Sequence, residues 1–211
     1  MSTTASLDRA AVAAAFERRV AAGTALADDA DAVAAACHAM AVRFHRGARL
    51  LVFGNGAAAT DAAHLAVEFI HPVIVGKRAL PALSLTNDAA LFSGLAAAGA
   101  YTDTFAAQVR LLARPEDIAL GISASGRCAN VAAGLVAADE LGLLTVALLG
   151  DGTVGDGPDI AASQAVAHVI QAHSSDPRVV KEVHVTVYHV LWELVHVFLE
   201  QPGLLGPEVI R

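Results

Sequence analysis

Short, continuous apolar runs alternate with helical segments through most of this chain of 211 residues. Such runs, without polar alternation, are typical of strands buried on both faces of a parallel sheet. They lie at residues 50–53, 79–85, 118–122, 144–149 and 167–170. Segments with helical spacing lie at about 59–70, 89–97, 102–113, 129–141 and 177–200. This order predicts an α/β domain with a doubly wound, five-stranded parallel sheet of the flavodoxin-like kind, flanked by helices.

Two alanine-rich segments of helical spacing, about 7–22 and 28–46, precede the first apolar run. The glycines after them, Gly23 and Gly47, are suited to helix C-termini. We expect a helical hairpin within residues 1–47 that packs on the main unit, 48–211, and takes part in an oligomer. The hydrophobic fraction of 55% also favours an assembly that covers part of the surface.

Charge and cysteine content exclude several classes of protein. The net charge is −7 without a basic cluster, which argues against nucleic acid or an anionic membrane as the main partner. No apolar run is long enough for a membrane helix, and the first residues lack a signal-peptide pattern. Cys37 and Cys128 lack the spacing of a disulfide framework or a metal site, which indicates reduced thiols. We therefore expect a cytoplasmic protein that binds a small molecule.

Two turns rich in small residues follow predicted strands, where helix N-termini offer N–H groups to anions. They are Gly54-Asn55-Gly56 and Ser123-Ala124-Ser125-Gly126. The first is similar to a dinucleotide-binding turn, but the acidic residue about 20 positions on is missing, since Asp88 comes later. Small residues also serve ordinary tight turns. Two such turns in one sheet favour a binding site.

Ionisable side chains gather on two predicted helices. His64 and Glu68 lie four residues apart, so they project from one helix face. Pairs with this spacing also occur as ordinary surface pairs. The last helix carries Lys181 and His189, whereas its other histidines are interpreted as packed or surface residues. A carboxylate and an imidazole in a pocket of low polarity can exchange protons near neutral pH.

Together these blocks resemble the SIS (sugar isomerase) family and, within it, the bacterial phosphoheptose isomerases. The resemblance runs from about residue 30 to residue 200. It is carried by Gly54-Asn55-Gly56 with Asp61, His64 and Glu68, Pro81-Ala82-Leu83 to Asp88, Phe105 with Gln108-Val109, Gly121-Ile122-Ser123 with Ser125-Gly126, and Glu182-Val183-His184 with His189.

The resemblance implies a SIS fold, a homotetramer, and interconversion of sedoheptulose 7-phosphate and a heptose 7-phosphate. By resemblance, Glu68 and His189 are the catalytic acid and base. A zinc ion, present in some members, would be held by His64, Glu68 and His189. Substrate-binding positions are Asn55, Gly56, Asp88, Ser123, Ser125, Arg127 and Lys181.

Several positions depart from the family pattern. Ala58, Ala124 and Cys128 replace hydroxyl residues, and Ala97-Ala98 replaces Asn-Asp. Arg127 is a candidate to replace the lost phosphate donors.

Lys181 stands where zinc-binding members have glutamine. A protonated ammonium cannot coordinate a metal, so zinc is held by the other three residues alone or is absent. We favour Lys181 as a replacement for the cation, stabilising an enediolate oxygen or pairing with Glu68.

An alternative function is that of a non-catalytic SIS protein, which binds a sugar phosphate or a protein partner. The replication-initiator-associating members are of this kind and generally lack the glutamate. Glu68 therefore favours an enzyme. An oligomeric structural protein with a vestigial pocket is a third interpretation.

Overall fold

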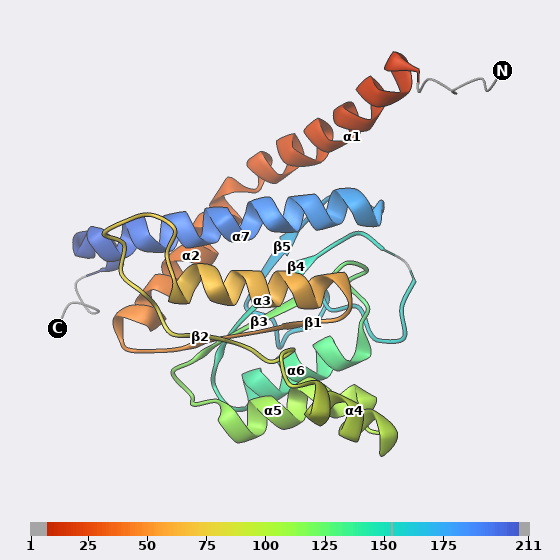
Figure 1. The fold of residues 1–211 in the computed structure, drawn as a ribbon. Helices are drawn as coiled ribbons and strands as arrows, with labels where there is room; N and C mark the ends of the chain where they lie inside the picture. Colours follow the sequence, from red (N-terminus) through yellow and green to blue (C-terminus); the bar gives the residue numbers. More distant parts are fainter. Residues whose placement is uncertain (1–7, 153, 207–211) are drawn as a thin grey trace.

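The sheet has five parallel strands in the order β2-β1-β3-β4-β5. A computed structural model describes residues 8–152 and 154–206 (Figure 1). The strands are β1 (Leu50–Gly54), β2 (Ala82–Ser84), β3 (Ile118–Ser123), β4 (Leu144–Leu149) and β5 (His168–Gln171). The predicted doubly wound, flavodoxin-like sheet is therefore confirmed.

The strand β2 is shorter than the predicted run 79–85. Leu80 and Leu85 are buried, as the run indicated, but Leu80 donates its N–H to the Phe69 carbonyl rather than to a strand. Pro81 has no N–H to give to a ladder, and its carbonyl accepts from Leu50. The apolar run is therefore longer than the strand, because residues on both sides of this short edge strand are also buried.

Helices cover both faces of the sheet (Figure 1). One face is covered by α2 (Ala30–His45), α3 (Ala57–Ile70) and α7 (Pro177–Glu200), and the other by α5 (Thr104–Leu112) and α6 (Ala129–Glu140), with α4 (Ala89–Ala97) beside them. Two short 3₁₀ helices, η1 (Tyr101–Asp103) and η2 (Pro202–Leu205), complete the elements of the described residues. Separate apolar cores fill the two layers, one around Phe44, Leu65 and Leu191, the other around Phe53 and Phe105.

The first helix, α1 (Arg9–Asp28), differs from the prediction in two ways. Gly23 does not end it but lies inside it, because its alanine-rich neighbours hold the helix at a cost of about 1 kcal/mol for the glycine. The predicted helical hairpin is also wrong: only Asp29 separates α1 from α2, and α1 projects away from the body instead of folding back on α2 (Figure 1). Gly47, with φ +88°, does follow the end of α2 as predicted.

Helices α3, α6 and α7 all begin at the carboxyl end of the sheet. They follow β1, β3 and β5 respectively, and parallel strands bring these ends to one rim. Asp176 caps α7 by accepting from the Arg178 N–H, and Pro177 takes the first helical position. α3 and α7 then run side by side over the same face (Figure 1). Among the described residues, no helix is long and apolar enough to cross a membrane.

Candidate active site

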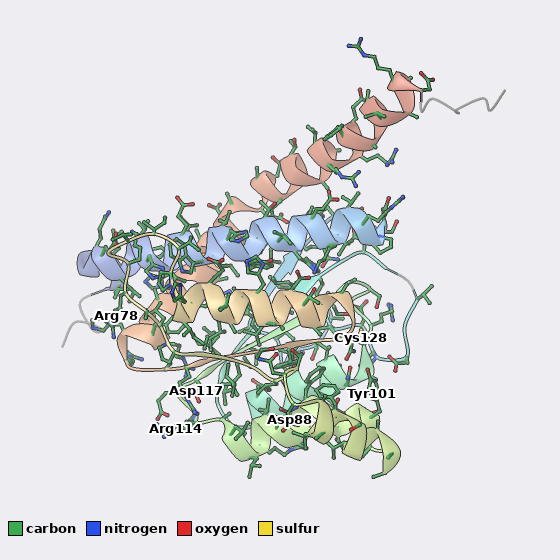
Figure 2. The ribbon with its side chains drawn as sticks, viewed as in Figure 1. Arg78, Asp88, Tyr101, Arg114, Asp117 and Cys128 are labelled. Carbon is green, nitrogen blue, oxygen red and sulfur yellow. The ribbon has the colours of Figure 1, made fainter. Side chains whose placement is uncertain are left out.

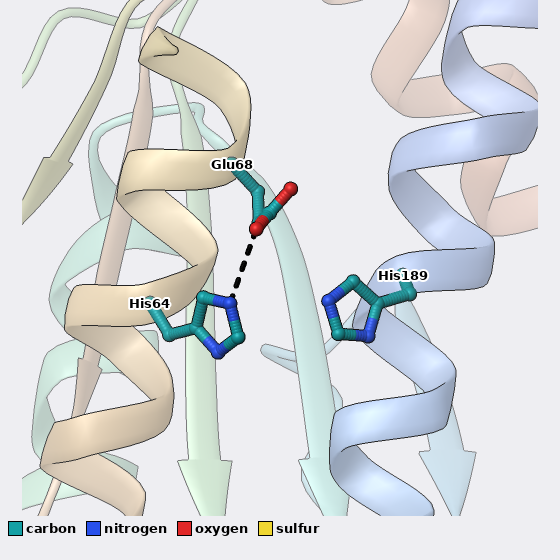
Figure 3. A group of neighbouring side chains, drawn as sticks. All are labelled: His64, Glu68 and His189. Carbon is teal, nitrogen blue, oxygen red and sulfur yellow. Dashed lines mark hydrogen bonds and ion pairs between the residues drawn. The ribbon is translucent and has the colours of Figure 1, made fainter. Parts of the chain in front are cut away.

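Three ionisable side chains meet between α3 and α7. The ligand-type atoms of His64, Glu68 and His189 all lie within 4.8 Å of one another. Figure 3 shows His64 and Glu68 on α3 facing His189 on α7. The His64 Nε2 and Glu68 Oε1 atoms are 3.1 Å apart, as the four-residue spacing predicted. Glu68 is buried, whereas both histidines are exposed, so the group opens to one side.

Tyr188 joins this group and was missed in the sequence. Its hydroxyl lies 2.8 Å from His64 Nδ1, and its ring centroid lies 4.8 Å from that of His189. Burial, with the negative charges of Asp61 and Glu68, raises the pKa of Tyr188 to about 12. The sequence does place this tyrosine among the aliphatic residues of a buried helix face. A buried phenol needs a hydrogen-bond partner, so its position indicated a polar neighbour.

A hollow of about 460 Å³ lies at the rim of the sheet, where three helices begin. Its lining includes residues at or beside the starts of α3, α6 and α7, where the positive ends of the helix dipoles favour an anion. The lining residues are Asn55, Ala58, Ile122, Ser123, Ala124, Ser125, Cys128, Gly152, Val154, Ser175 and Pro177. Most side chains of this lining are small or apolar, so the polar groups are few.

The Asn55 side chain is fixed by a network of hydrogen bonds. Its amide exchanges two hydrogen bonds with Asn130, of 2.7 and 2.9 Å, and its oxygen also accepts from the Tyr101 hydroxyl. Asn130 in turn donates to Thr104. Asn55 is thus oriented from α6 and η1, at the edge of the hollow. The sequence offered no signal for this pairing, because the partners are far apart in the chain.

Glycines allow the segment after β4 to lie against the second turn. A Cβ atom at Gly152 would stand 2.7 Å from Ser125 Cα, and one at Gly157 would stand 2.6 Å from the Ala129 nitrogen. Only glycine permits this approach. In the turn itself, Gly126 has φ +66°, and the Ser123 hydroxyl donates to Cys128 Sγ at 3.2 Å.

Comparisons with known proteins match the sequence and the fold of this chain to one family. The sequence model of the SIS domain matches residues 15–150. The phosphoheptose isomerase of Solidesulfovibrio magneticus is 39% identical over 185 residues, covering 85% of both chains, and that of Geotalea daltonii is 38% identical, covering 77% of this chain and 81% of its own. The solved phosphoheptose isomerase of Neisseria gonorrhoeae superposes with a TM-score of 0.78 at 27% identity, covering 89% of this chain and 97% of its own.

This chain belongs to the SIS domain family. Its sequence and its fold are both similar to those of phosphoheptose isomerases, as the motif blocks predicted.

The two parts of this SIS site are separate along α3. The residues that line the hollow do not include Glu68 or His189. Ala58 lines the hollow, and His64 follows six residues later, which is about 9 Å along a helix axis. The reason is that α3 and α7 run away from the rim in parallel, so their middle turns meet at some distance from it. A ligand must be elongated to contact both parts.

Lys181 does not pair with Glu68, which corrects that alternative. Its ammonium contacts Asp61 Oδ1 at 2.5 Å, Thr60 Oγ1 at 2.9 Å and the Ala57 carbonyl at 2.9 Å. An ammonium has three protons, so all of them have acceptors in the first turns of α3. Burial raises the pKa of Asp61 more than the neighbouring Lys181 lowers it. Lys181 therefore links α7 to the first turns of α3, at a position between the hollow and the histidines.

Arg127 and Asp88 lie outside the hollow. The Arg127 guanidinium pairs with Asp159 at 3.1 Å, and it lines a second hollow of about 300 Å³ beyond Ser125. Asp88 caps α4 by accepting from the Leu91 N–H at 2.9 Å, which is a structural role. Figure 2 labels Asp88 near the start of α4 and Cys128 at the start of α6. Both residues were assigned to substrate binding by the resemblance, not by their spacing along the chain.

Proposed function

We propose that this chain is a sugar-phosphate isomerase that interconverts sedoheptulose 7-phosphate and a heptose 7-phosphate. The observation that carries the proposal is the convergence of Glu68, His64 and His189 from two helices of a chain similar to phosphoheptose isomerases over most of its length. A ketose 7-phosphate is elongated, with its carbonyl and its phosphate at opposite ends. It matches a site whose two parts are separated along α3.

The reaction needs one group to move a proton between two carbons and another to move a proton between their oxygens. We assign the first task to Glu68, because its carboxylate is buried, held by His64 and directed to the opening between the helices. We assign the second to His189, which faces it from α7. The buried surroundings of Glu68 strengthen its interactions with the reacting atoms.

We assign the phosphate to the hollow at the rim. Ser123, Ser125 and Asn55 supply polar groups there, and the starts of three helices supply positive dipole ends. Helix N-termini thus compensate for the hydroxyl groups that Ala58, Ala124 and Cys128 lack. Arg127 is not needed for this role, since Asp159 already pairs with it.

We further propose that His64, Glu68 and His189 can hold a zinc ion. Two imidazoles and a carboxylate form a donor set used by catalytic zinc sites, which leave a fourth position open. The ion would act as a Lewis acid toward the carbonyl group of the substrate. Lys181 cannot complete the set, because its three protons are held by α3. Zinc is thus compatible with the residues present.

We also propose a homotetramer in the cytoplasm. α1 exposes Phe16 at 67% and Val20 at 66%, which is unfavourable for a lone chain in water. The exposed side of His64 and His189 would then be closed by a neighbouring copy. Two free cysteines, Cys37 and Cys128, are in keeping with a reducing compartment.

The test is proton exchange with solvent deuterium during turnover of sedoheptulose 7-phosphate, followed by NMR. Glu68→Gln should lower the exchange rate by about 10²- to 10⁴-fold, the usual contribution of a general acid or base. Glu140→Gln is the matched control, because Glu140 is exposed at the end of α6 on the other face of the sheet, and its rate should equal the wild-type rate.

Exchange that survives Glu68→Gln at the wild-type rate would remove Glu68 as the base. Absence of exchange in the wild-type protein, combined with measurable binding of the sugar phosphate by calorimetry, would support the non-catalytic alternative. The apolar lining of the hollow is the observation that keeps this alternative open.

A further inference from the structure

The tyrosine between the two histidines contacts both of them. The Tyr188 side chain is fully buried, and its ring centroid lies 5.3 Å from that of His64 and 4.8 Å from that of His189. Its hydroxyl lies 2.8 Å from His64 Nδ1. The other ring nitrogen of His64 lies 3.1 Å from Glu68 Oε1. A continuous path of hydrogen bonds thus runs from α7 to α3 and along α3 to the carboxylate.

The protons in this path have one favourable arrangement. The phenol keeps its proton at neutral pH, as an ordinary tyrosine hydroxyl does. If that proton goes to His64 Nδ1, then Nε2 carries the imidazole proton and donates it to Glu68. In the other tautomer, Nε2 and the carboxylate would be two acceptors face to face, and the buried hydroxyl would lose its acceptor. Unpaired buried groups of this kind cost about 1–3 kcal/mol each.

We propose that Tyr188 is a positioning residue that fixes the neutral His64 tautomer with its proton on Nε2. His64 is thereby held to Glu68 Oε1, and the second carboxylate oxygen is left to act on the substrate. The role in catalysis rests on the proposed isomerase function, whereas the tautomer does not. Because a hydroxyl can also accept, Tyr188 could equally receive a proton from Nδ1 when Nε2 binds a metal.

The tautomer is measured directly by ¹⁵N–¹H correlation NMR of the imidazole groups in metal-free protein. The pH is set well above the ordinary histidine pKa of about 6.5, so that neutral rings are observed. His64→Gln identifies the signals of His64 among the nine histidines. The expected spectrum shows a protonated Nε2 and an unprotonated Nδ1. A protonated Nδ1 in the wild-type protein overturns the proposal.

Tyr188→Phe removes the hydroxyl and keeps the ring. The His64 signals should then show a mixture of tautomers, and zinc affinity should fall by about 10- to 100-fold, the usual effect of losing a group that orients a metal ligand. In turnover, kcat should fall about tenfold with KM unchanged, because the hydroxyl orients His64 without touching the substrate.

Thr186→Val is the matched control, since it also removes a hydroxyl from α7, where Thr186 is exposed and its hydroxyl donates to the Glu182 carbonyl. It should leave the tautomer, zinc affinity and kcat at wild-type values. A Tyr188→Phe protein that keeps the single Nε2–H tautomer overturns the proposal. If the wild-type protein shows the predicted tautomer but turns over no sugar phosphate, the isomerase function fails while the tautomer assignment stands.

Discussion

Asp117 is a single buried carboxylate that joins two strand beginnings. It accepts from the Arg49 backbone N–H at 2.8 Å, from the Arg49 guanidinium at 2.6 Å and from the Arg114 N–H at 3.0 Å. Burial alone would raise the pKa of Asp117, but these hydrogen bonds outweigh it, and the net shift is downward. Figure 2 shows Asp117 and Arg114 at the end of the molecule away from Cys128. The residue therefore bears on stability and not on the site.

Asp117→Asn should lower the free energy of unfolding by about 2 kcal/mol at neutral pH, since hydrogen bonds to a charged group are lost. A lowered folded-state pKa means that the stabilisation is complete above the unfolded value of about 3.9 and is lost as the pH falls below it. Urea unfolding of both proteins at pH 7 and at about pH 3 measures the difference in their free energies of unfolding at each pH.

The difference between the wild-type and Asp117→Asn proteins should narrow only in the acidic series. The exposed Asp139→Asn control should differ little from the wild type at either pH. An Asp117→Asn protein as stable as the wild type at pH 7 would contradict the assignment.

Side-chain contacts were predicted well between residues close in the sequence and less well between residues far apart. The pairing of His64 with Glu68 follows from their separation on one helix. The partner of Lys181 does not follow from its position in the sequence, because an ammonium on a long side chain can reach several acceptors. Asp61 lies next to it because α7 packs on α3. Tyr188 was hidden for the same reason.

At the scale of elements, two helical glycines have opposite surroundings. A Cβ at Gly134 in α6 would lie 2.8 Å from Phe53 Cε2 and 2.9 Å from Phe105 Cβ, whereas nothing lies within 4 Å of one at Gly94 in α4. Gly134 thus lets α6 approach the sheet and α5, and Gly94 serves no packing purpose.

Gly134→Ala should therefore destabilise the protein by about 1–3 kcal/mol through overpacking. Gly94→Ala should stabilise it by about 0.5–1 kcal/mol through helix propensity. Thermal unfolding of both variants measures the contrast. A gain in stability for both would contradict the close contact at Gly134.

The elements themselves were predictable because each buries a continuous apolar stretch. The range of α7 was predicted without error, since Asp176 and Pro177 mark its start. The end of α1 was predicted wrongly. The sequence does not distinguish a glycine inside a helix from a glycine that follows one, because the difference lies in the conformation of the next residues. The geometry of α1 relative to α2 depends on contacts that the pattern does not contain.

At the scale of the molecule, α1 has the properties of an assembly element. It projects from the body (Figure 1). Phe16 and Val20 are exposed on it, four residues apart and so on one face, and a hollow of about 240 Å³ lies between its end, the start of α2, and α7. Phe16→Glu should therefore shift the protein to smaller species in analytical ultracentrifugation, because a charge would be buried between copies.

Arg18→Gln is the matched control, since it makes the same change in net charge on another face of α1. It should sediment like the wild type. Wild-type protein that sediments as a single chain would contradict the proposed assembly.

The pairing of α3 with α7 also has a consequence for biosynthesis. His64 leaves the ribosome long before His189, and the strands between them can fold while the final helix is still being made. A nascent chain thus lacks the proposed site until α7 has been released and docked, and any product of premature termination before α7 would fold in part without that site.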